Sequence, residues 1–450
     1  MAVVSVVKLS ELEGAKRLDA EYYQPEYLEV ERLITRSSFA HLGDLITEII
    51  HPKEIKREYE EEKKDYLFLL AQNVRPLMFD LSEKKYISEE TAELLSRNLL
   101  EYGDILFIRT GAVGVVTAYN GYPEKVYASA HILIGKPNFT VSPFYLAVFL
   151  NTKFGKSLII RGTYGAVQPE ISPEYLKKIP IPLLNNEVVS EVENLFLKAQ
   201  NLLKESEIIY SQAESILLSE LGLQGFEPED KIFYEVNLST VNTSHRIDAE
   251  YFNPKYDVII EKIRNYKHGY GKLLNFAEYI KPNFEPRTYS QKIFPYIELA
   301  DINRSIGLIQ SSTIIKGEEA PNRARRILKK NDIIISRVEG SLEKVALVDE
   351  EFENSLASTG FFQFRSKNIL PEVLLVLSKS PIIQSQLKKE CAGTILTAVP
   401  QKSIVGLIIP ILPEEIQWAI TKFVTQSHET RKKAEKLLEK AKKIVEDAIE

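Results

Sequence analysis

Two stretches of this chain repeat one pattern of apolar and small residues with the period of a helix. Residues of this kind recur at alternating steps of four and three positions, the spacing of a coiled-coil seam. Each stretch therefore predicts a helix of about 37 residues and about 55 Å. The first set is Val188, Val192, Leu195, Ala199, Leu202, Ser206, Ile209, Ala213 and Ile216. The second set, 228 positions later, is Ile416, Ile420, Phe423, Ser427, Thr430, Ala434, Leu437, Ala441 and Ile444.

The shared seam favours pairing of these two helices with each other. Several seam positions carry small residues, which would let two helices approach closely. Gly222 is the first glycine after the first seam and is expected to end that helix. The alternative, in which each helix packs only on its own domain, also fits the pattern.

The remaining chain contains short apolar or β-branched runs bounded mostly by Gly, Asn and Asp, as is typical of strands. These runs predict strands at 67–70, 105–108, 113–118 and 131–134, and again at 296–299, 333–336, 345–348 and 361–364. Residues 91–100 and 142–154 predict helices. The alternation of both element types indicates a mixed α/β fold.

The two halves of the chain also repeat each other outside the helices. Residues 17–27, Arg-Leu-Asp-Ala-Glu-Tyr-Tyr-Gln-Pro-Glu-Tyr, return 229 positions later as Arg-Ile-Asp-Ala-Glu-Tyr-Phe-Asn-Pro-Lys-Tyr. Shorter matches keep nearly the same displacement: 103–109 with 331–337, 128–129 with 357–358, 162–163 with 393–394, and 179–181 with 409–411. Residues 47–98 and 281–330 share almost nothing. We therefore predict two copies of one module, at 1–184 and 223–413, each followed by a long helix, at 185–222 and 414–450.

Composition narrows the classes of function. The net charge of −6 excludes a uniformly basic nucleic-acid coat, but it does not exclude local basic patches. The single cysteine, Cys391, excludes an intrachain disulfide and a cysteine-rich zinc site, and the six histidines lack metal-ligand spacing. Apolar runs are far shorter than a membrane span. We expect a cytoplasmic protein that uses no cofactor or metal and does not bind membranes.

The repeated motifs resemble a known family. An Asp-Ala-Glu-Tyr entry, a Gly-Asp-Ile-Leu strand that leads to an arginine, a Gly-Thr loop before Ile-Pro-Ile-Pro and a long helix occur twice and span the chain. This order looks like the DNA-specificity subunits of type I restriction-modification systems. The resemblance implies two target recognition domains on an antiparallel helix pair, with pseudo-two-fold symmetry. It also implies a bipartite, asymmetric site on double-stranded DNA and two adenine methyltransferase subunits as partners, and leaves open a restriction or translocase subunit.

Residues 321–330 are the most basic stretch of the chain. Arg323, Arg325, Arg326, Lys329 and Lys330 occur there without an acidic residue, which suits contact with DNA phosphates. The alternative is a solvated helix face. In the first copy, the candidate basic residues are interleaved with acids, so the signal is weaker.

Arg109 and Arg337 end matching predicted strands just before glycine-containing turns. The planar fork of arginine suits guanine or phosphate, although a repeated structural ion pair is the alternative. The Gly-Thr loops add Tyr164, Gln168 and Thr394 as candidate DNA contacts, which the resemblance implies lie beside DNA. Gln168 could bond adenine; a plain tight connection would also explain the glycines.

The entry motif, with Asp19 and Asp248, predicts a structural role, because acidic side chains would repel phosphate. We expect these residues at a helix terminus or a docking surface. Their aromatic neighbours are expected to be packed; these are Tyr22, Tyr23, Tyr251 and Phe252.

The rival class is an enzyme, either an adenine methyltransferase or a nuclease. The chain has no Pro-Pro dipeptide for a methyltransferase Asn-Pro-Pro-Tyr loop, no phosphate-binding loop and no nuclease cluster of Asp, Glu and Lys. We therefore expect a subunit without catalytic residues. Other readings are a coiled-coil scaffold that does not bind DNA, and the recognition part of a related methyltransferase system.

Overall fold

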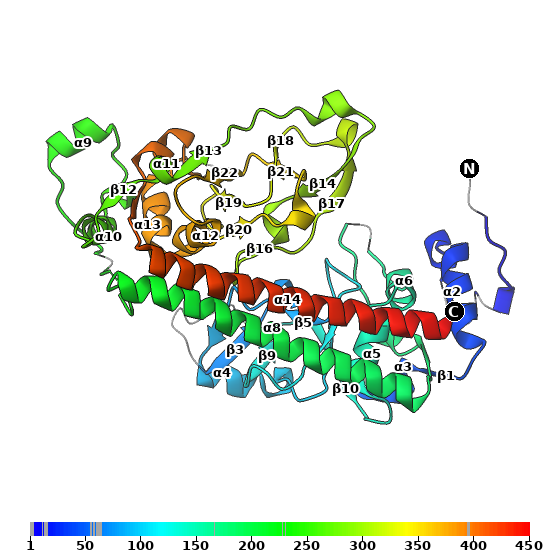
Figure 1. Cartoon of the computed structure of the whole chain (residues 1–450). Helices are drawn as coiled ribbons and strands as arrows, with labels where there is room; N and C mark the ends of the chain where they lie inside the picture. The colour runs from blue at the N-terminus through cyan, green and yellow to red at the C-terminus, as the bar shows by residue number, and fades with distance from the viewer. Residues whose placement is uncertain are drawn as a thin grey trace. The chain divides into compact units, whose positions relative to one another are not determined.

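The computed structural model describes residues 4–10, 12, 17–54, 56, 59, 65–165, 167–226, 228–229, 231–393 and 397–450. The chain forms two compact units (Figure 1). Unit 1 comprises Met1–Leu203 with Arg431–Glu450, and unit 2 comprises Lys204–Thr430. Helices and strands alternate in both, so the predicted mixed α/β fold is confirmed.

The strands of unit 1, within the described residues, form one four-stranded sheet, one three-stranded sheet and two smaller pairs. Their bounds are β1 Phe39–His41, β2 Ile46–Ile50, β3 Tyr66–Leu69, β4 Val74–Arg75, β5 Met78–Phe79, β6 Lys85–Ile87, β7 Ile105–Ile108, β8 Val116–Ala118, β9 Val126–Ala128, β10 Ile132–Pro137 and β11 Pro180–Pro182. The larger sheet has the order β2-β10-β7-β8, and the smaller has the order β6-β3-β9 with β3 parallel to β9. The remaining pairs are β1-β11 and β4-β5.

The described strands of unit 2 follow a closely similar order. Their bounds are β12 Tyr270–Lys272, β13 Ala277–Tyr279, β14 Ile293–Ile297, β15 Ile302–Asn303, β16 Leu308–Ile309, β17 Thr313–Lys316, β18 Ala324–Ile327, β19 Asp332–Ser336, β20 Val345–Leu347, β21 Leu356–Ser358, β22 Phe361–Ser366 and β23 Ile408–Pro410. One sheet is β13-β22-β19-β20-β16-β15, and the other is β17-β14-β21-β18 with β14 parallel to β21. β12 pairs with β23, as β1 pairs with β11 in unit 1.

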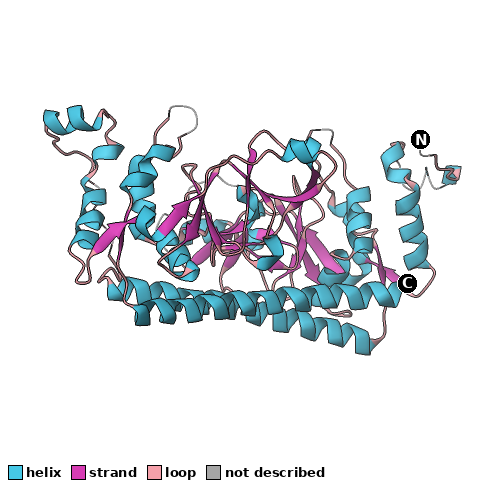
Figure 2. Cartoon of the chain, turned by 45° about the horizontal axis from the view of Figure 1, so that its top comes forward, coloured by secondary structure: helices cyan, strands magenta, loops and turns pink. Residues whose placement is uncertain are grey.

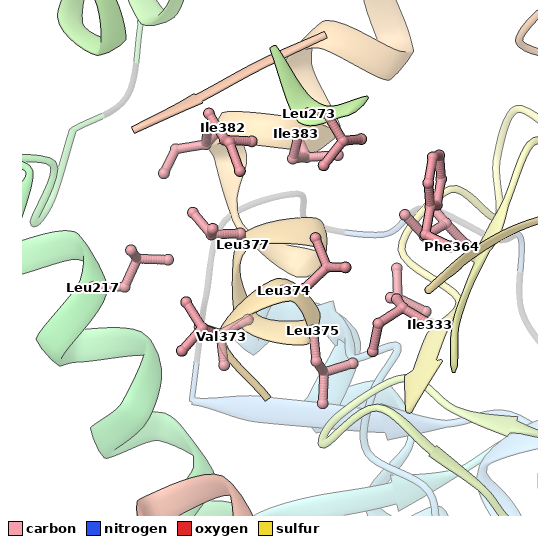
Figure 3. Packing of buried hydrophobic residues seen from close by; sticks show 14 of the residues in the cluster. Leu217, Leu273, Ile333, Phe364, Val373, Leu374, Leu375, Leu377, Ile382 and Ile383 are labelled. Atoms are coloured by element: carbon pink, nitrogen blue, oxygen red, sulfur yellow. The ribbon is translucent and has the colours of Figure 1, made fainter. Parts of the chain in front are cut away.

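Helices cover these sheets and complete the cores. In unit 1 they are α2 Pro25–Thr35, α3 Leu42–Leu45, α4 Glu89–Leu94, α5 Pro143–Leu150, α6 Lys153–Arg161 and α7 Pro173–Leu176. In unit 2 they are α9 Leu238–Ser244, α10 Pro254–Arg264, α11 Leu273–Phe276, α12 Pro371–Lys379 and α13 Pro381–Glu390. Short 3-10 turns are η1 Ala20–Tyr23, η2 Ala71–Asn73, η3 Ser96–Asn98, η4 Glu250–Phe252, η5 Pro286–Tyr289, η6 Leu299–Asp301, η7 Gly317–Glu319, η8 Glu350–Phe352 and η9 Gln401–Gly406. Figure 3 shows leucines of α12 among Ile333, Phe364, Ile382 and, on the long helix, Leu217.

Two predicted helices differ from the structure. The single helix expected at 142–154 is two helices, α5 and α6, because Thr152 begins a new helix by accepting a hydrogen bond from the Gly155 N–H at 3.1 Å. The helix expected at 91–100 is only the short α4 followed by η3. In both cases the apolar pattern continues across the break, which at α6 is made by the cap of Thr152.

The long helices, α8 Asn186–Glu220 and α14 Glu414–Ile449, pack together. In unit 1, Val192 and Phe196 of α8 share one core with Ala441 and Val445 of α14. In unit 2, the other ends meet, since the C-terminal half of α8 shares a core with the N-terminal half of α14. The two helices therefore run in opposite directions, and Figures 1 and 2 both show them side by side.

The buried stripe is offset by one residue from the proposed seam at six of the seam positions. Of the proposed residues, Val192, Ile209 and Ile420 are buried, whereas Leu195, Leu202, Ile216, Phe423, Leu437 and Ile444 are only partly buried. At each of these six places, the next residue in the sequence is buried instead; these residues are Phe196, Leu203, Leu217, Val424, Leu438 and Val445. Each helix packs on the sheet-bearing part of a unit as well as on its partner helix, so its apolar stripe is wider than a two-position seam.

A direct contact between the helices occurs where both carry a serine. The Ser427 hydroxyl donates a hydrogen bond to the Ser206 carbonyl at 2.6 Å, and neither side chain is exposed. Only small residues fit at such a close approach.

We expect Ser427→Leu to lower the free energy of unfolding by about 1–3 kcal/mol, because the larger side chain overpacks the contact. Ser427→Ala, which only removes the hydrogen bond, should cost about 0.5–1.5 kcal/mol. Lys422→Leu, at an exposed position of the same helix, should change stability by about 0.5 kcal/mol or less. Urea unfolding followed by circular dichroism checks this order, and a fully stable Ser427→Leu variant would contradict the close contact.

Candidate nucleic-acid interface

Arg109 and Arg337 have the same backbone environment in the two units. Arg109 follows strand β7 and Arg337 follows strand β19. The Arg109 N–H donates to the His131 carbonyl and the Arg337 N–H donates to the Gly360 carbonyl, both at 2.9 Å. The backbone carbonyls of the two arginines accept hydrogen bonds from the far end of the Gly-Thr loop. The donor to Arg109 is the Ile171 N–H at 3.1 Å, and the donor to Arg337 is the Val399 N–H at 2.8 Å. These bonds tie the end of the strand to the loop.

The Arg109 side chain lies in a polar cluster and is 28% exposed. Its guanidinium donates to Nε2 of His51 at 2.7 Å and pairs with Glu170 at 3.2 Å. The Tyr164 hydroxyl also donates to Glu170, at 3.4 Å. Arg109 and Tyr164, which were predicted separately, therefore meet at one carboxylate on the surface of unit 1.

The Arg337 side chain differs from that of Arg109. Its guanidinium lies over the Phe362 ring, 5.5 Å from the centroid. Within the described part of the chain, no carboxylate forms an ion pair with it. Arg337 is thus a half-buried cation without the neutralising partner that Glu170 provides in unit 1.

The Gly-Thr loop of unit 1 is a tight turn. Tyr164 and Glu170 exchange two backbone hydrogen bonds, of 3.0 and 2.8 Å, and Gly165 at the bend has a φ of +98° that favours glycine. Gln168 lies exposed near the tip. In unit 2, Ala392 and Ala398 exchange the equivalent pair of bonds, both of 3.0 Å, while Thr394 lies outside the described residues.

The centre of the basic stretch, Ala324–Ile327, forms strand β18 rather than a helix, and the basic side chains of 321–330 do not share one face. Residues of β18 alternate between the interior and the surface, as strands require. Arg323 pairs with Glu298 at 2.5 Å, and Arg325 pairs with Glu285. Lys329 and Lys330 are exposed, and Lys330 pairs with Glu350 at 2.8 Å.

Arg326 points inward and is wrong as a predicted DNA contact. It is 2% exposed and donates to the Ile280 carbonyl at 2.6 Å and to the Tyr279 hydroxyl at 3.1 Å. Burial lowers the pKa of its guanidinium, and the nearby charge of Arg337 lowers it less. In unit 1, Asn98 lies 228 positions earlier and similarly donates from a buried side chain to the Lys53 carbonyl, at 3.1 Å.

Each unit has a hollow near the end of its central strand, lined in unit 2 by Arg337 itself and in unit 1 by His131, whose carbonyl accepts the Arg109 N–H. The hollow of unit 2 has a volume of about 500 Å³ and is lined by Glu298, Leu299, Ala300, Arg323, Arg337, Val338, Ser358, Thr359, Gly360 and Ala398. The hollow of unit 1 is only about 30 Å³ and is lined by Lys53, Glu54, Tyr59, Phe68, Leu70, Ser129, Ala130 and His131. Ser129, Ala130 and His131 precede Ser358, Thr359 and Gly360 by 229 positions, so the hollows occupy equivalent places with different linings.

Sequence analysis missed His51, His131 and Glu298. His51 and Glu298 lie in the segments where the two copies differ, and His131 lies two residues after the repeated Ala-Ser pair, where the second copy has Gly360. A single charged or aromatic residue at such a position carries no pattern. The repeated Ala-Ser pair at 128–129 and 357–358 marked this place, but the chemistry of the lining required the structure.

The repeated entry motif holds a helix end in both units. Arg17 forms a double hydrogen bond with Asp19, at 2.6 and 2.7 Å, and donates to the Thr163 carbonyl at 3.0 Å. Arg246 binds Asp248 in the same way and donates to the Cys391 carbonyl at 2.6 Å. Hydrogen bonding to the arginine lowers the pKa of each aspartate. These forks lie where α6 and α13 end and the Gly-Thr loops begin, so the structural role expected for this motif is observed.

Metal sites and membrane-spanning helices are not found in the described part of the chain. No group of three or more His, Cys, Asp or Glu side chains is placed to hold a metal ion there. None of the helices in that part is long and apolar enough to cross a membrane.

No protein-family model matches this chain, and no curated protein is similar to it in sequence. Among solved structures, it is similar to the S subunit of a type I restriction-modification system from M. genitalium, with 13% identity over 92% of this chain and 94% of that chain and a TM-score of 0.42. It is also similar to the HsdS subunit from Thermoanaerobacter tengcongensis, with 14% identity over 92% and 96% of the two chains and a TM-score of 0.29. A third match, the type IIG restriction endonuclease BpuSI, has 11% identity, covers 41% of this chain and 29% of that chain, and has a TM-score of 0.30.

Proposed function

We propose that this chain is the DNA sequence-specificity subunit of a type I restriction-modification complex. The observation that carries the proposal is the equivalent placement, in both units, of a strand-end arginine, a pair of backbone hydrogen bonds that closes the following loop, and a hollow whose lining differs between the units. A backbone arrangement that both units share, with a different set of residues lining each hollow, suits the recognition of two different DNA sequences. The chain then recognises a bipartite, asymmetric site on double-stranded DNA.

In this proposal the modules at 1–184 and 223–413 are target recognition domains related by a pseudo-two-fold axis. Duplex DNA has two-fold axes perpendicular to its length, so related modules suit half-sites of opposite strand polarity. The long helices pair as an antiparallel coiled coil and fix the number of unread base pairs between the half-sites. Two adenine methyltransferase subunits dock on this frame and supply catalysis, and a restriction or translocase subunit can join them.

The proposed DNA contacts of unit 1 are Arg109, Tyr164 and Gln168. Those of unit 2 are Arg323, Arg325, Lys329, Lys330 and Arg337. The cation of Arg337 suits a phosphate, because the described residues supply no carboxylate to pair with it. Arg109 is neutralised by Glu170. Arg109 can therefore contact DNA only if it releases Glu170, or if both side chains contact the DNA together.

Methylation mapping tests the proposal. The full chain is expressed with the adenine methyltransferase subunit encoded beside its gene, and the host genome is read by long-read sequencing. We expect a split motif, two short fixed halves around a constant gap, that appears only when this chain is present. Methylation that is the same without the chain would favour a scaffold that does not bind DNA.

We expect Arg337→Ala to weaken DNA binding by the same complex without changing the motif, because a phosphate contact carries no base information. The slope of log K against log salt concentration should become less negative by about 1, since one fewer counterion is released. Titration of a labelled duplex at several salt concentrations measures both effects. Arg97→Ala, which removes an exposed arginine paired with Glu48, is the control. A changed motif or an unchanged slope for Arg337→Ala would exclude phosphate contact.

A further inference from the structure

The hollow of unit 2 has an arginine and a glutamate side by side at its rim. Nη2 of Arg323 lies 2.5 Å from Oε1 of Glu298, and the side chains are 63% and 41% exposed. Arg323 directly precedes β18, and its carbonyl accepts a hydrogen bond from the Thr359 N–H at 2.8 Å. The backbone under the pair is therefore held in place while the charged groups stay accessible.

The backbone of Glu298 is fixed by a turn that both units share. Its N–H donates to the Asp301 side chain at 2.8 Å at the start of η6. In unit 1, the Leu70 N–H donates to the Asn73 side chain at 2.9 Å at the start of η2. Glu298 therefore occupies the structural position of Leu70, and a carboxylate replaces an apolar side chain on the same backbone.

Unit 1 closes the place of Glu298 with apolar residues. Leu70 packs there against a cluster that contains Leu95, which is 1% exposed. The fold therefore does not require a charged side chain at this position, and an exposed ion pair contributes little to stability. Stability alone does not explain the charged pair of unit 2.

The chemistry of the pair suits a base edge better than the DNA backbone. A carboxylate beside the guanidinium would repel a phosphate. In the major groove, arginine donates two hydrogen bonds to O6 and N7 of guanine, and a glutamate accepts one from N4 of cytosine. Adjacent arginine and glutamate side chains can therefore address both members of one base pair.

We propose that Glu298 and Arg323 read a G·C base pair in the half-site contacted by unit 2. This inference rests on the proposed function. Arg323 contacts the guanine and Glu298 the cytosine, while the neighbouring Ser358, Thr359 and Gly360 leave the hollow open to the base edge. Unit 1, with Leu70 at the position of Glu298, does not read a base pair in this way.

The test compares Arg323→Ala and Glu298→Gln with the unaltered chain, each as the full chain in the complex with its methyltransferase. The methylated motif is mapped in the host genome, and binding is measured on duplexes in which each base pair of the motif is changed in turn. We expect one position, in one half of the motif, to lose its preference for G·C by roughly ten- to hundred-fold. The other half should keep its sequence.

Arg97→Ala provides a matched control, because Arg97 and Glu48 form an exposed arginine–glutamate pair in unit 1 that lines neither hollow. It should leave every position of the motif unchanged. Arg323→Lys should retain part of the preference for guanine, and thermal unfolding of each variant checks the fold.

The possible outcomes distinguish failure of the G·C reading from failure of the proposed function. A split motif that Arg323→Ala and Glu298→Gln leave unaltered, or weaken evenly at all positions, would overturn the reading of a G·C pair and leave the proposed function standing. No split motif with the unaltered chain would overturn the proposed function itself.

Discussion

The structure depends on the shared burial of two long helices. The core of unit 1 contains the N-terminal half of α8 and the C-terminal half of α14, and the core of unit 2 contains the other two halves. Each helix must therefore remain continuous through residues 203–204 or 430–431, where one core gives way to the other. Small buried residues, among them Ala199, Ser206 and Ser427, allow this close packing.

On that frame, backbone hydrogen bonds are kept while side chains change. The entry forks of Arg17 and Arg246 hold the ends of α6 and α13, and the following loops return to Arg109 and Arg337. The buried side chains of Asn98 and Arg326 both donate hydrogen bonds to backbone carbonyls, although one is an amide and the other a guanidinium. The two segments thus diverge almost completely in sequence while these backbone hydrogen bonds are kept in both units.

Periodicity and self-similarity predicted the strands at 105–108 and 333–336 well, because runs that are apolar throughout and end at turn residues have few other solutions. They also predicted both long helices and the matched arginines. They could not place the basic stretch at 321–330, since a count of charges does not say which alternate side chains of a strand face inward. They also missed Glu298, which only becomes notable beside Arg323. The offset of the buried stripe, from Leu195 to Phe196, depends on a third packing partner that a seam pattern does not contain.

The division of α14 between the two cores has a consequence for synthesis. Ala434, Leu438, Ala441 and Val445 belong to the core built around the first part of the chain, yet the ribosome adds them only after Lys204–Thr430 has been made. Domains usually fold in order as they emerge. Unit 1 instead has to wait, with part of its apolar surface uncovered, until the whole of Lys204–Thr430 has been translated. The speed at which α14 follows therefore sets how long the core of unit 1 stays incomplete.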